Sequence, residues 1–256
     1  MQFNSEQLLL YAVTDRAWVG RQTLLEQIED ALAGGATLIQ LREKDLDAES
    51  FLNEAVQARE ICHRHGVPLI INDNVEVALK ATADGVHVGN EDAPVAELRR
   101  RVGSDFIIGA TAKTVEQAQL AQESGADGVH VGIEDAPVQQ IRRRTGSDFI
   151  IGATAKTVEQ ARLAEASGAD YLGVGAVFPS PTKKTAIRIT NAQLREICAS
   201  VRIPAVAIGG INAENALEIC GCGARGIAVV SAIFAAQDIR TAAAALRTIA
   251  TQVAGI

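Results

Sequence analysis

Short apolar runs alternate with helical patterns along most of the chain. The apolar runs cover residues 8–14, 37–42, 67–71, 85–89, 106–110, 171–177, 205–208 and 226–230. Helical patterns cover residues 23–33, 49–63, 95–101, 115–124, 191–200 and the C-terminal stretch, and several of them stop at a glycine just before the next run. Short strands alternating with helices of about ten residues predict parallel βαβ units.

Two adjacent stretches of the chain are nearly identical. Residues 84–126 and residues 127–169, aligned at an offset of 43, agree at 35 positions and differ at eight. Similarity this close at a fixed period indicates a tandem duplication. Each copy holds two strand–helix modules, so the chain has ten βα modules, or eight without one copy.

This count predicts an α/β fold of the TIM type, a parallel (βα) barrel forming one domain over residues 1–256. A doubly wound open sheet competes with it, but no G-x-G-x-x-G follows the first strand. The ring can close with eight or with ten strands. Ten strands would widen the ring, whereas eight would leave apolar strand faces and open edges to be covered.

Composition narrows the function classes. The chain has 256 residues, is 48% hydrophobic and 4% aromatic, and carries a net charge of −7. An acidic chain is not expected to bind nucleic acid or an anionic membrane. Four irregularly spaced cysteines suit reduced thiols. With no signal pattern and no apolar run near ~20 residues, we expect a cytoplasmic protein.

Two segments have the residue types of a phosphate site. Gly209-Gly210 and Val230-Ser231 follow the last two strands, where barrels commonly hold a phosphate with backbone N–H groups and a helix N-terminus. Ser180-Pro181-Thr182-Lys183 places two hydroxyls and a lysine on one loop, which suits a pyrophosphate.

Carboxylates and further polar residues follow the earlier strands. Asp73 ends the third strand and Asp92 follows the fourth, so the two carboxylates can hold Mg²⁺ beside a diphosphate. Each aspartate taken singly fits a helix N-cap as well. Gln40, Arg42 and Lys44 alternate and therefore share one face, as ligand-binding residues would.

Together these residues form a set of motifs that resembles a known family. The motifs are QLREK (40–44), IND (71–73), GVHVG-x-ED (85–92), IIGAT (107–111), GVGAVFPSPTK (173–183), AIGGIN (207–212) and VVSAIF (229–234). In this order they resemble thiamine phosphate synthase. The resemblance implies a TIM barrel that joins 4-amino-5-hydroxymethyl-2-methylpyrimidine diphosphate to 4-methyl-5-(2-phosphoethyl)thiazole phosphate. The products are thiamine phosphate and pyrophosphate, and Mg²⁺ is required.

The resemblance also implies roles for individual positions. Asp73 and Asp92 would hold Mg²⁺, and Arg42, Lys183 and His87 would be the catalytic residues. The substrate-binding positions would be Gln40, Arg42, Lys44, Asn72, Thr111, Thr154, Ser180, Thr182, Lys183, Gly210, Val230 and Ser231. A dissociative reaction fits this set, because the main need is to stabilise the departing pyrophosphate.

The repeat leaves several alternatives open. Asn90 of the first copy is Ile133 in the second, which favours Asp92 over Asp135 for the metal, whereas Thr111 and Thr154 are equivalent candidates.

A thiazole tautomerase-like isomerase and a catalytically impaired scaffold are the alternative functions. The three-arginine runs at 99–101 and 142–144 are predicted to be solvated helix faces. The expected partners are the small-molecule substrates, and a homo-oligomer stays open.

Overall fold

The structure is a computed structural model of the whole chain, and it describes residues 5–89, 95–102, 106–132, 135–146, 148–179 and 187–256. Its strands form one closed parallel ring in the order β1-β10-β9-β8-β7-β6-β5-β4-β3-β2. Every strand pairs in parallel with its two neighbours, and β1 closes the ring by pairing with both β2 and β10. The strands are β1 (Leu10–Val13), β2 (Leu38–Leu41), β3 (Leu69–Asn72), β4 (Gly85–Val88), β5 (Ile107–Ala112), β6 (Gly128–Val131), β7 (Ile150–Ala155), β8 (Tyr171–Val174), β9 (Ala205–Ile208) and β10 (Gly226–Val229).

The predicted (βα) barrel is therefore confirmed, and the strand number that the sequence left open is ten. Both repeat units contribute fully to the wall, the first with β4 and β5 and the second with β6 and β7. All ten strands enter the ring because each inserted strand then has a hydrogen-bonding neighbour on both sides, and none is left as an open edge.

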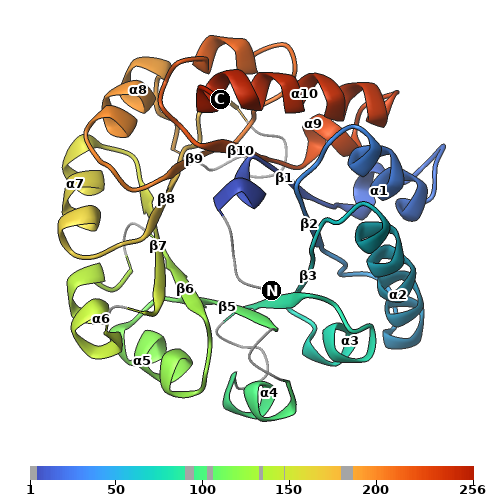
Figure 1. Cartoon of the computed structure of the whole chain (residues 1–256), viewed down its shortest axis with the longest axis horizontal. Coiled ribbons are helices and arrows are strands. Elements are labelled where there is room, and N and C mark those ends of the chain that lie inside the picture. Colours follow the sequence, from blue (N-terminus) through green and yellow to red (C-terminus); the bar gives the residue numbers. More distant parts are fainter. Residues whose placement is uncertain (1–4, 90–94, 103–105, 133–134, 147, 180–186) are drawn as a thin grey trace.

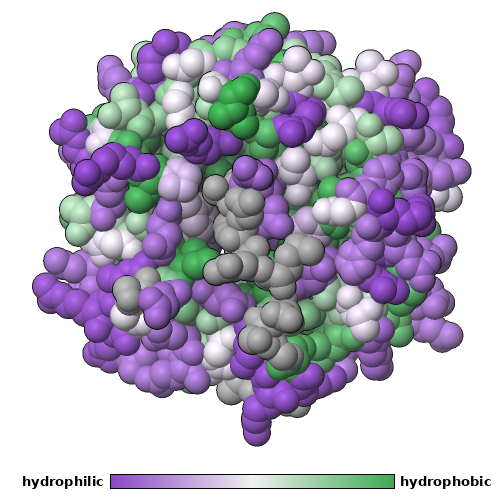
Figure 2. Space-filling model, in the orientation of Figure 1, coloured by the Kyte–Doolittle hydropathy of each residue, from purple (hydrophilic) through white to green (hydrophobic). Residues whose placement is uncertain are grey.

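Helices surround the ring on its outside (Figure 1). They are α1 (Leu24–Ala33), α2 (Ala48–Arg64), α3 (Val75–Lys80), α4 (Val95–Arg101), α5 (Val115–Glu123), α6 (Val138–Thr145), α7 (Val158–Ala166), α8 (Asn191–Ala199), α9 (Ser231–Phe234) and α10 (Ile239–Ala254), with short 3-10 turns η1 (Ser5–Leu8), η2 (Arg16–Trp18) and η3 (Ala216–Ile219). Seen along the ring axis, the surface toward the rim is mostly hydrophilic (Figure 2), as expected for helices whose apolar faces pack on the sheet.

Local sequence explains where the helices of the repeats begin. Thr114 caps α5 and Thr157 caps α7, each with a glutamine three residues later that returns the hydrogen bond. This reciprocal arrangement satisfies backbone N–H groups that the first turn leaves without a partner, and it contributes on the order of 1 kcal/mol per cap. Because both copies keep the motif, both helices start at the same point of the repeat.

The first strand is shorter than predicted. Residues 5–8 form η1, which lies inside the ring in Figure 1, and β1 begins only at Leu10. Leu8 turns inward and joins a small cluster within the ring made with Leu38, Ile70, Val206 and Ala228. The main core is the separate, larger layer between the outer face of the sheet and the helices.

The prediction that both three-arginine runs are solvated faces is wrong for the first arginine of each. Arg142 is 18% exposed and donates hydrogen bonds to the carbonyl oxygens of Gly146, Phe149 and Gly168 and to the carboxylate of Asp170. Arg99 occupies the equivalent place in the first copy, with Asp127 as its carboxylate partner at 2.6 Å. Each arginine joins its helix to the turns before the next two strands, because these turns present carbonyl oxygens and a carboxylate that can accept its hydrogen bonds.

Candidate active site

Polar side chains collect at the carboxyl ends of the strands, which all open at one end of the ring because the ring is parallel. Gln40 ends the inward row of β2 and is 9% exposed. Asn72 is the last residue of β3 and lies opposite His87 of β4 in the sheet register. The structure thus brings these predicted site residues onto adjacent strands, as the sequence indicated.

Asp73 has a backbone conformation that residues other than glycine seldom adopt. Its φ is 65°, in the left-handed region, and its amide donates a 2.8 Å hydrogen bond to the carbonyl oxygen of His87. A non-glycine residue in this region costs on the order of 1 kcal/mol or more, and such residues gather at functional sites. The chain therefore turns sharply at the tip of β3, where a metal-binding carboxylate was predicted.

His87 and Thr111 connect the next two strands. His87 Nε2 and Thr111 Oγ1 lie 3.1 Å apart in hydrogen-bonding contact, and the second copy repeats this pair as His130 and Thr154 at the same distance. The surroundings of the second histidine differ, since His130 Nδ1 also lies 3.3 Å from the Tyr171 hydroxyl. Burial, with the nearby His87 in support, lowers the pKa of His130 to about 4.

The loop after β2 is held by an ion-pair network that the sequence did not indicate. The Glu43 side chain is 1% exposed and accepts hydrogen bonds from the amides of Lys44 and Asp45, at 2.7 and 2.8 Å, and from Arg16. Arg16 also donates to both carboxylate oxygens of Glu54, at 2.8 and 2.6 Å. Burial acts to raise the pKa of Glu43, but these hydrogen bonds outweigh it and the pKa lies below its ordinary value.

This network positions two of the predicted substrate-binding residues. Arg42 and Lys44 flank Glu43, so the hydrogen bonds that restrain Glu43 restrain their backbone as well. The Arg42 amide donates to the Thr14 hydroxyl at 2.9 Å, and the Arg42 guanidinium lies 3.6 Å from Asp15. One feature of the sequence could have indicated this network. The motif TDR (14–16) follows the first strand, and its arginine lies opposite the glutamate of QLREK at the end of the adjacent strand.

The predicted phosphate loops lie side by side, because β9 and β10 are paired. Gly209 and Gly210 have φ values of 95° and 68°, and a Cβ at Gly210 would overlap the carbonyl oxygens of Phe178 and Pro179. Only glycine suits this approach. Ser231 is the first residue of α9, with Val230 as its N-cap, so backbone N–H groups of a helix start lie beside the diglycine turn.

Asp92, Ser180, Thr182 and Lys183 lie outside the described residues, as do Asn90 and Ile133. Asp135, the second-copy counterpart of Asp92, accepts a 2.6 Å hydrogen bond from the Gly132 amide and is thereby tied to its own turn. Within the described part of the chain, no group of three or more histidine, cysteine, aspartate or glutamate side chains could hold a metal. A Mg²⁺ site of one or two carboxylates completed by phosphate oxygens needs no such group, so Asp73 at the strand end fits it.

Ring order separates the two threonine candidates. Apart from Thr154, the described candidate residues all lie on or directly after β9, β10, β2, β3, β4 and β5, an arc that β1 completes. Thr111 belongs to this arc, whereas Thr154 lies on β7, beside β8. The two threonines therefore face different neighbours, although each contacts the histidine of its own copy.

A family model described as "Thiamine monophosphate synthase" matches the chain twice, over residues 10–127 and 117–233. The chain belongs to this family. The "Thiamine-phosphate synthase" of Ruminiclostridium cellulolyticum is 40% identical over 234 residues, which cover 91% of each chain. That of Clostridium beijerinckii is 41% identical over 238 residues, which cover 93% of each.

A solved structure supports both fold and family. The "Thiamine phosphate pyrophosphorylase from Pyrococcus furiosus" is 34% identical with a TM-score of 0.63, and the match covers 97% of this chain and 98% of that one. The family that the seven motifs predicted is thus confirmed, and with it the prediction of an enzyme. None of the described helices has the length and apolar character needed to cross a membrane.

Proposed function

We propose that the chain transfers the pyrimidinylmethyl group of 4-amino-5-hydroxymethyl-2-methylpyrimidine diphosphate to the nitrogen of 4-methyl-5-(2-phosphoethyl)thiazole phosphate. The bond from the methylene carbon to the diphosphate oxygen breaks, the bond to the thiazole nitrogen forms, and pyrophosphate leaves with the electron pair. Family membership supports this transferase activity. The single observation that carries the residue assignment is the arc of strand ends that holds Gln40, Asn72, Asp73 and the diglycine turn at one mouth.

In this mechanism the chain's own residues bind and orient both substrates. Gln40, Asn72 and the restrained loop with Arg42 and Lys44 would hold the pyrimidine diphosphate. The positive charges of the Arg42 guanidinium and the Lys44 ammonium matter most where they lie beside the leaving group. Negative charge develops on the leaving group in a dissociative reaction. The amides around Gly210 and Ser231 would hold the thiazole phosphate and keep the thiazole nitrogen in line with the reacting carbon.

The sharp turn at Asp73 supports the metal assignment. Asp73, together with Asp92, would hold Mg²⁺, which when bound supplies positive charge to the diphosphate oxygens. Lys183, Ser180 and Thr182 would complete the pyrophosphate site from the loop after β8. We assign the first copy, with His87 and Thr111, to the pyrimidine side, because these residues adjoin Asn72 and Asp73 around the ring.

A catalytically impaired scaffold is the second candidate, and ring closure with ten strands is the observation that favours it. Strands β6 and β7 stand between β8 and the β5 end of the arc of candidate residues, whereas β8 pairs with β9 at the other end. Because barrel diameter grows with strand number, the loop after β8 lies farther around the mouth from β3 than in a ring without this pair. Such a scaffold would bind phosphate without turnover. A single domain over residues 1–256 and a reducing, cytoplasmic location, consistent with four free cysteines, complete the proposal.

The test is turnover by the purified full chain with Mg²⁺ and both substrates, followed by chromatography of thiamine phosphate and a coupled assay of pyrophosphate. Asp73→Asn keeps a residue that tolerates the left-handed turn but removes the charge. We expect it to lower kcat/KM by about 100-fold or more, roughly 3 kcal/mol of transition-state stabilisation, with unchanged thermal stability. Glu196→Gln, which removes an exposed carboxylate from α8, is the control. A folded wild-type chain that binds pyrophosphate but forms no thiamine phosphate would establish the scaffold instead.

A further inference from the structure

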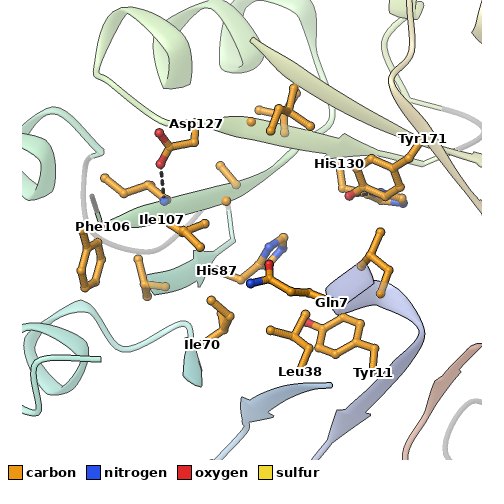
Figure 3. Close-up of a pocket in the computed structure, with 18 of the residues that line it drawn as sticks. Gln7, Tyr11, Leu38, Ile70, His87, Phe106, Ile107, Asp127, His130 and Tyr171 are labelled. Atoms are coloured by element: carbon orange, nitrogen blue, oxygen red, sulfur yellow. Dashed lines mark hydrogen bonds between the residues drawn. The ribbon is translucent and has the colours of Figure 1, made fainter. Parts of the chain in front are cut away.

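A cavity of about 390 Å³ lies inside the ring at the end opposite to the candidate active site. Its walls are formed at the amino-terminal starts of the strands by Leu38, Ile70, Ile107, Ile150 and Tyr171, with Gln7 of η1 also in the lining. Figure 3 shows the labelled side chains around a common space, with Tyr11 and Leu38 on one side and His130 and Tyr171 on another. The candidate active site lies instead at the carboxyl ends.

The cavity follows from the way in which the repeat widens the ring. In an eight-stranded barrel, layers of side chains fill the interior, and each added strand increases the diameter. The inserted strands bring glycines to the inner row, Gly109 in the first copy and Gly128 and Gly152 in the second. The circumference of the ring thus increases, while the inserted strands add few side chains to its interior.

Two of these glycine positions differ in how closely a side chain covers them. The Tyr171 ring occupies the space over Gly152, where a Cβ would overlap the ring. Over the equivalent Gly109 the nearest atom is His87 Nδ1, 3.0 Å from the place of a Cβ, and Gly109 lines the cavity. The two copies therefore differ inside the ring, and residues of both copies line the cavity.

Three polar groups in the buried part of the lining, His130, Tyr171 and Tyr11, are uncharged at neutral pH. Burial lowers the pKa of His130 to about 4, and burial raises the pKa of Tyr171 to about 12. Burial likewise raises the pKa of Tyr11, whose hydroxyl makes no hydrogen bond to the described residues. At the rim, the carboxylate of Asp127 already accepts hydrogen bonds from the Ile108 amide and from Arg99, each at 2.6 Å.

We propose that this cavity is a binding site for a small, uncharged aromatic molecule that carries one hydroxyl group. The volume falls in the range of small-molecule pockets, and the lining combines apolar walls with a few convergent polar groups. An aromatic ligand would pack beside His130 and Tyr171, whose rings lie 5.8 Å apart. An anionic ligand would lose its hydration and would meet the carboxylate of Asp127 at the rim. The cavity shares His87 with the residues assigned to the pyrimidine, but it lies toward the amino-terminal ends of the strands and does not depend on the proposed function.

The probe is 4-fluorophenol, with fluorine NMR of the full chain at neutral pH as the measurement. We expect saturable binding, and we expect the anion 4-fluorobenzoate to bind at least tenfold more weakly. Ile150→Trp fills the cavity and should weaken binding of 4-fluorophenol by at least tenfold. Leu163→Trp adds the same side chain on the outside of α7, at a residue that is 68% exposed, and should leave binding unchanged.

A milder variant keeps the test decisive if Ile150→Trp does not fold. Tyr171→Phe retains the ring and removes the hydroxyl, so it should weaken 4-fluorophenol several-fold while fluorobenzene binds as before. An excess of Mg²⁺ and pyrophosphate should not displace the probe. The proposal is overturned by non-saturable binding in the wild type, by equal effects of the two tryptophan variants, by equal affinity for the anion, or by displacement with pyrophosphate.

Discussion

Replacement of His130 by glutamine is expected to reduce the loss of stability that the protein suffers between neutral pH and pH 5. His130 is buried beside His87, and this environment lowers its pKa to about 4 from a usual value of 6.5. Glutamine retains a polar side chain that can contact the Thr154 and Tyr171 hydroxyls but does not titrate. The substitution therefore removes the proton-binding site and keeps most of the local hydrogen bonding.

The direction and size of the effect follow from proton linkage. Between pH 6.5 and pH 4 the unfolded chain binds a proton at His130 and the folded chain does not, so acid favours unfolding in this window. With pKa values of about 4 folded and 6.5 unfolded, the free energy of unfolding falls by roughly 2 kcal/mol between pH 7.5 and pH 5. The full effect, below pH 4, is about 3 kcal/mol.

Urea unfolding followed by circular dichroism at pH 7.5 and at pH 5 measures this difference. Carboxylates that titrate in the same range contribute equally to both proteins, so the comparison of wild type with His130→Gln isolates the histidine. His63→Gln is the control, because the His63 side chain is 43% exposed. If the free energies of unfolding of wild type and His130→Gln decrease in parallel on acidification, the inferred environment of His130 is wrong.

Three further substitutions test the packing and the site. Arg142→Ala should lower the free energy of unfolding by about 3 kcal/mol, because it leaves a partner carboxylate and several carbonyl oxygens unpaired, whereas exposed Arg143→Ala should change it little in the same denaturation assay. Gly152→Ala should cost about 1–3 kcal/mol through overlap with the Tyr171 ring. Calorimetry should show a smaller shift for Gly109→Ala, because the nearest atom to its Cβ would be His87 Nδ1 at 3.0 Å. Arg16→Met leaves a buried carboxylate without its cation, so we expect a loss of about 3 kcal/mol and a raised KM for the pyrimidine diphosphate. If Arg16→Met matches the wild type both in its free energy of unfolding and in its KM for the pyrimidine diphosphate, the positioning role of Arg16 is contradicted.

Local sequence patterns were sufficient to predict the strand–helix modules and the family. The boundaries of β9 were predicted to the residue, and α1 begins directly after the capping Thr23 that opened the predicted helix. Such features depend on neighbours in sequence, because capping and strand periodicity act within a few residues. The seven motifs identified the family for a related reason, since each motif is a short stretch at one strand end.

Contacts between distant segments were not predictable in this way. The Arg16–Glu43–Glu54 network joins three separate elements, and the role of Arg142 depends on carbonyl oxygens of a turn that the sequence pattern does not expose. Nearly identical repeat sequences also acquire different surroundings, since His87 and His130 each contact the threonine of their own copy but His130 also lies beside the Tyr171 hydroxyl. Position in the ring, rather than local sequence, distinguishes the two copies.

By itself, the sequence determined ten strand–helix modules, their parallel sense, and the group of polar residues at the carboxyl ends of the strands. Only the tertiary structure decided that all ten strands close into one ring and that a cavity opens at the amino-terminal end. The physical reason is that a module forms from local hydrogen bonds and periodicity, whereas closure depends on every strand finding two partners at once. The space inside is then set by the number of strands and by the size of their inward side chains.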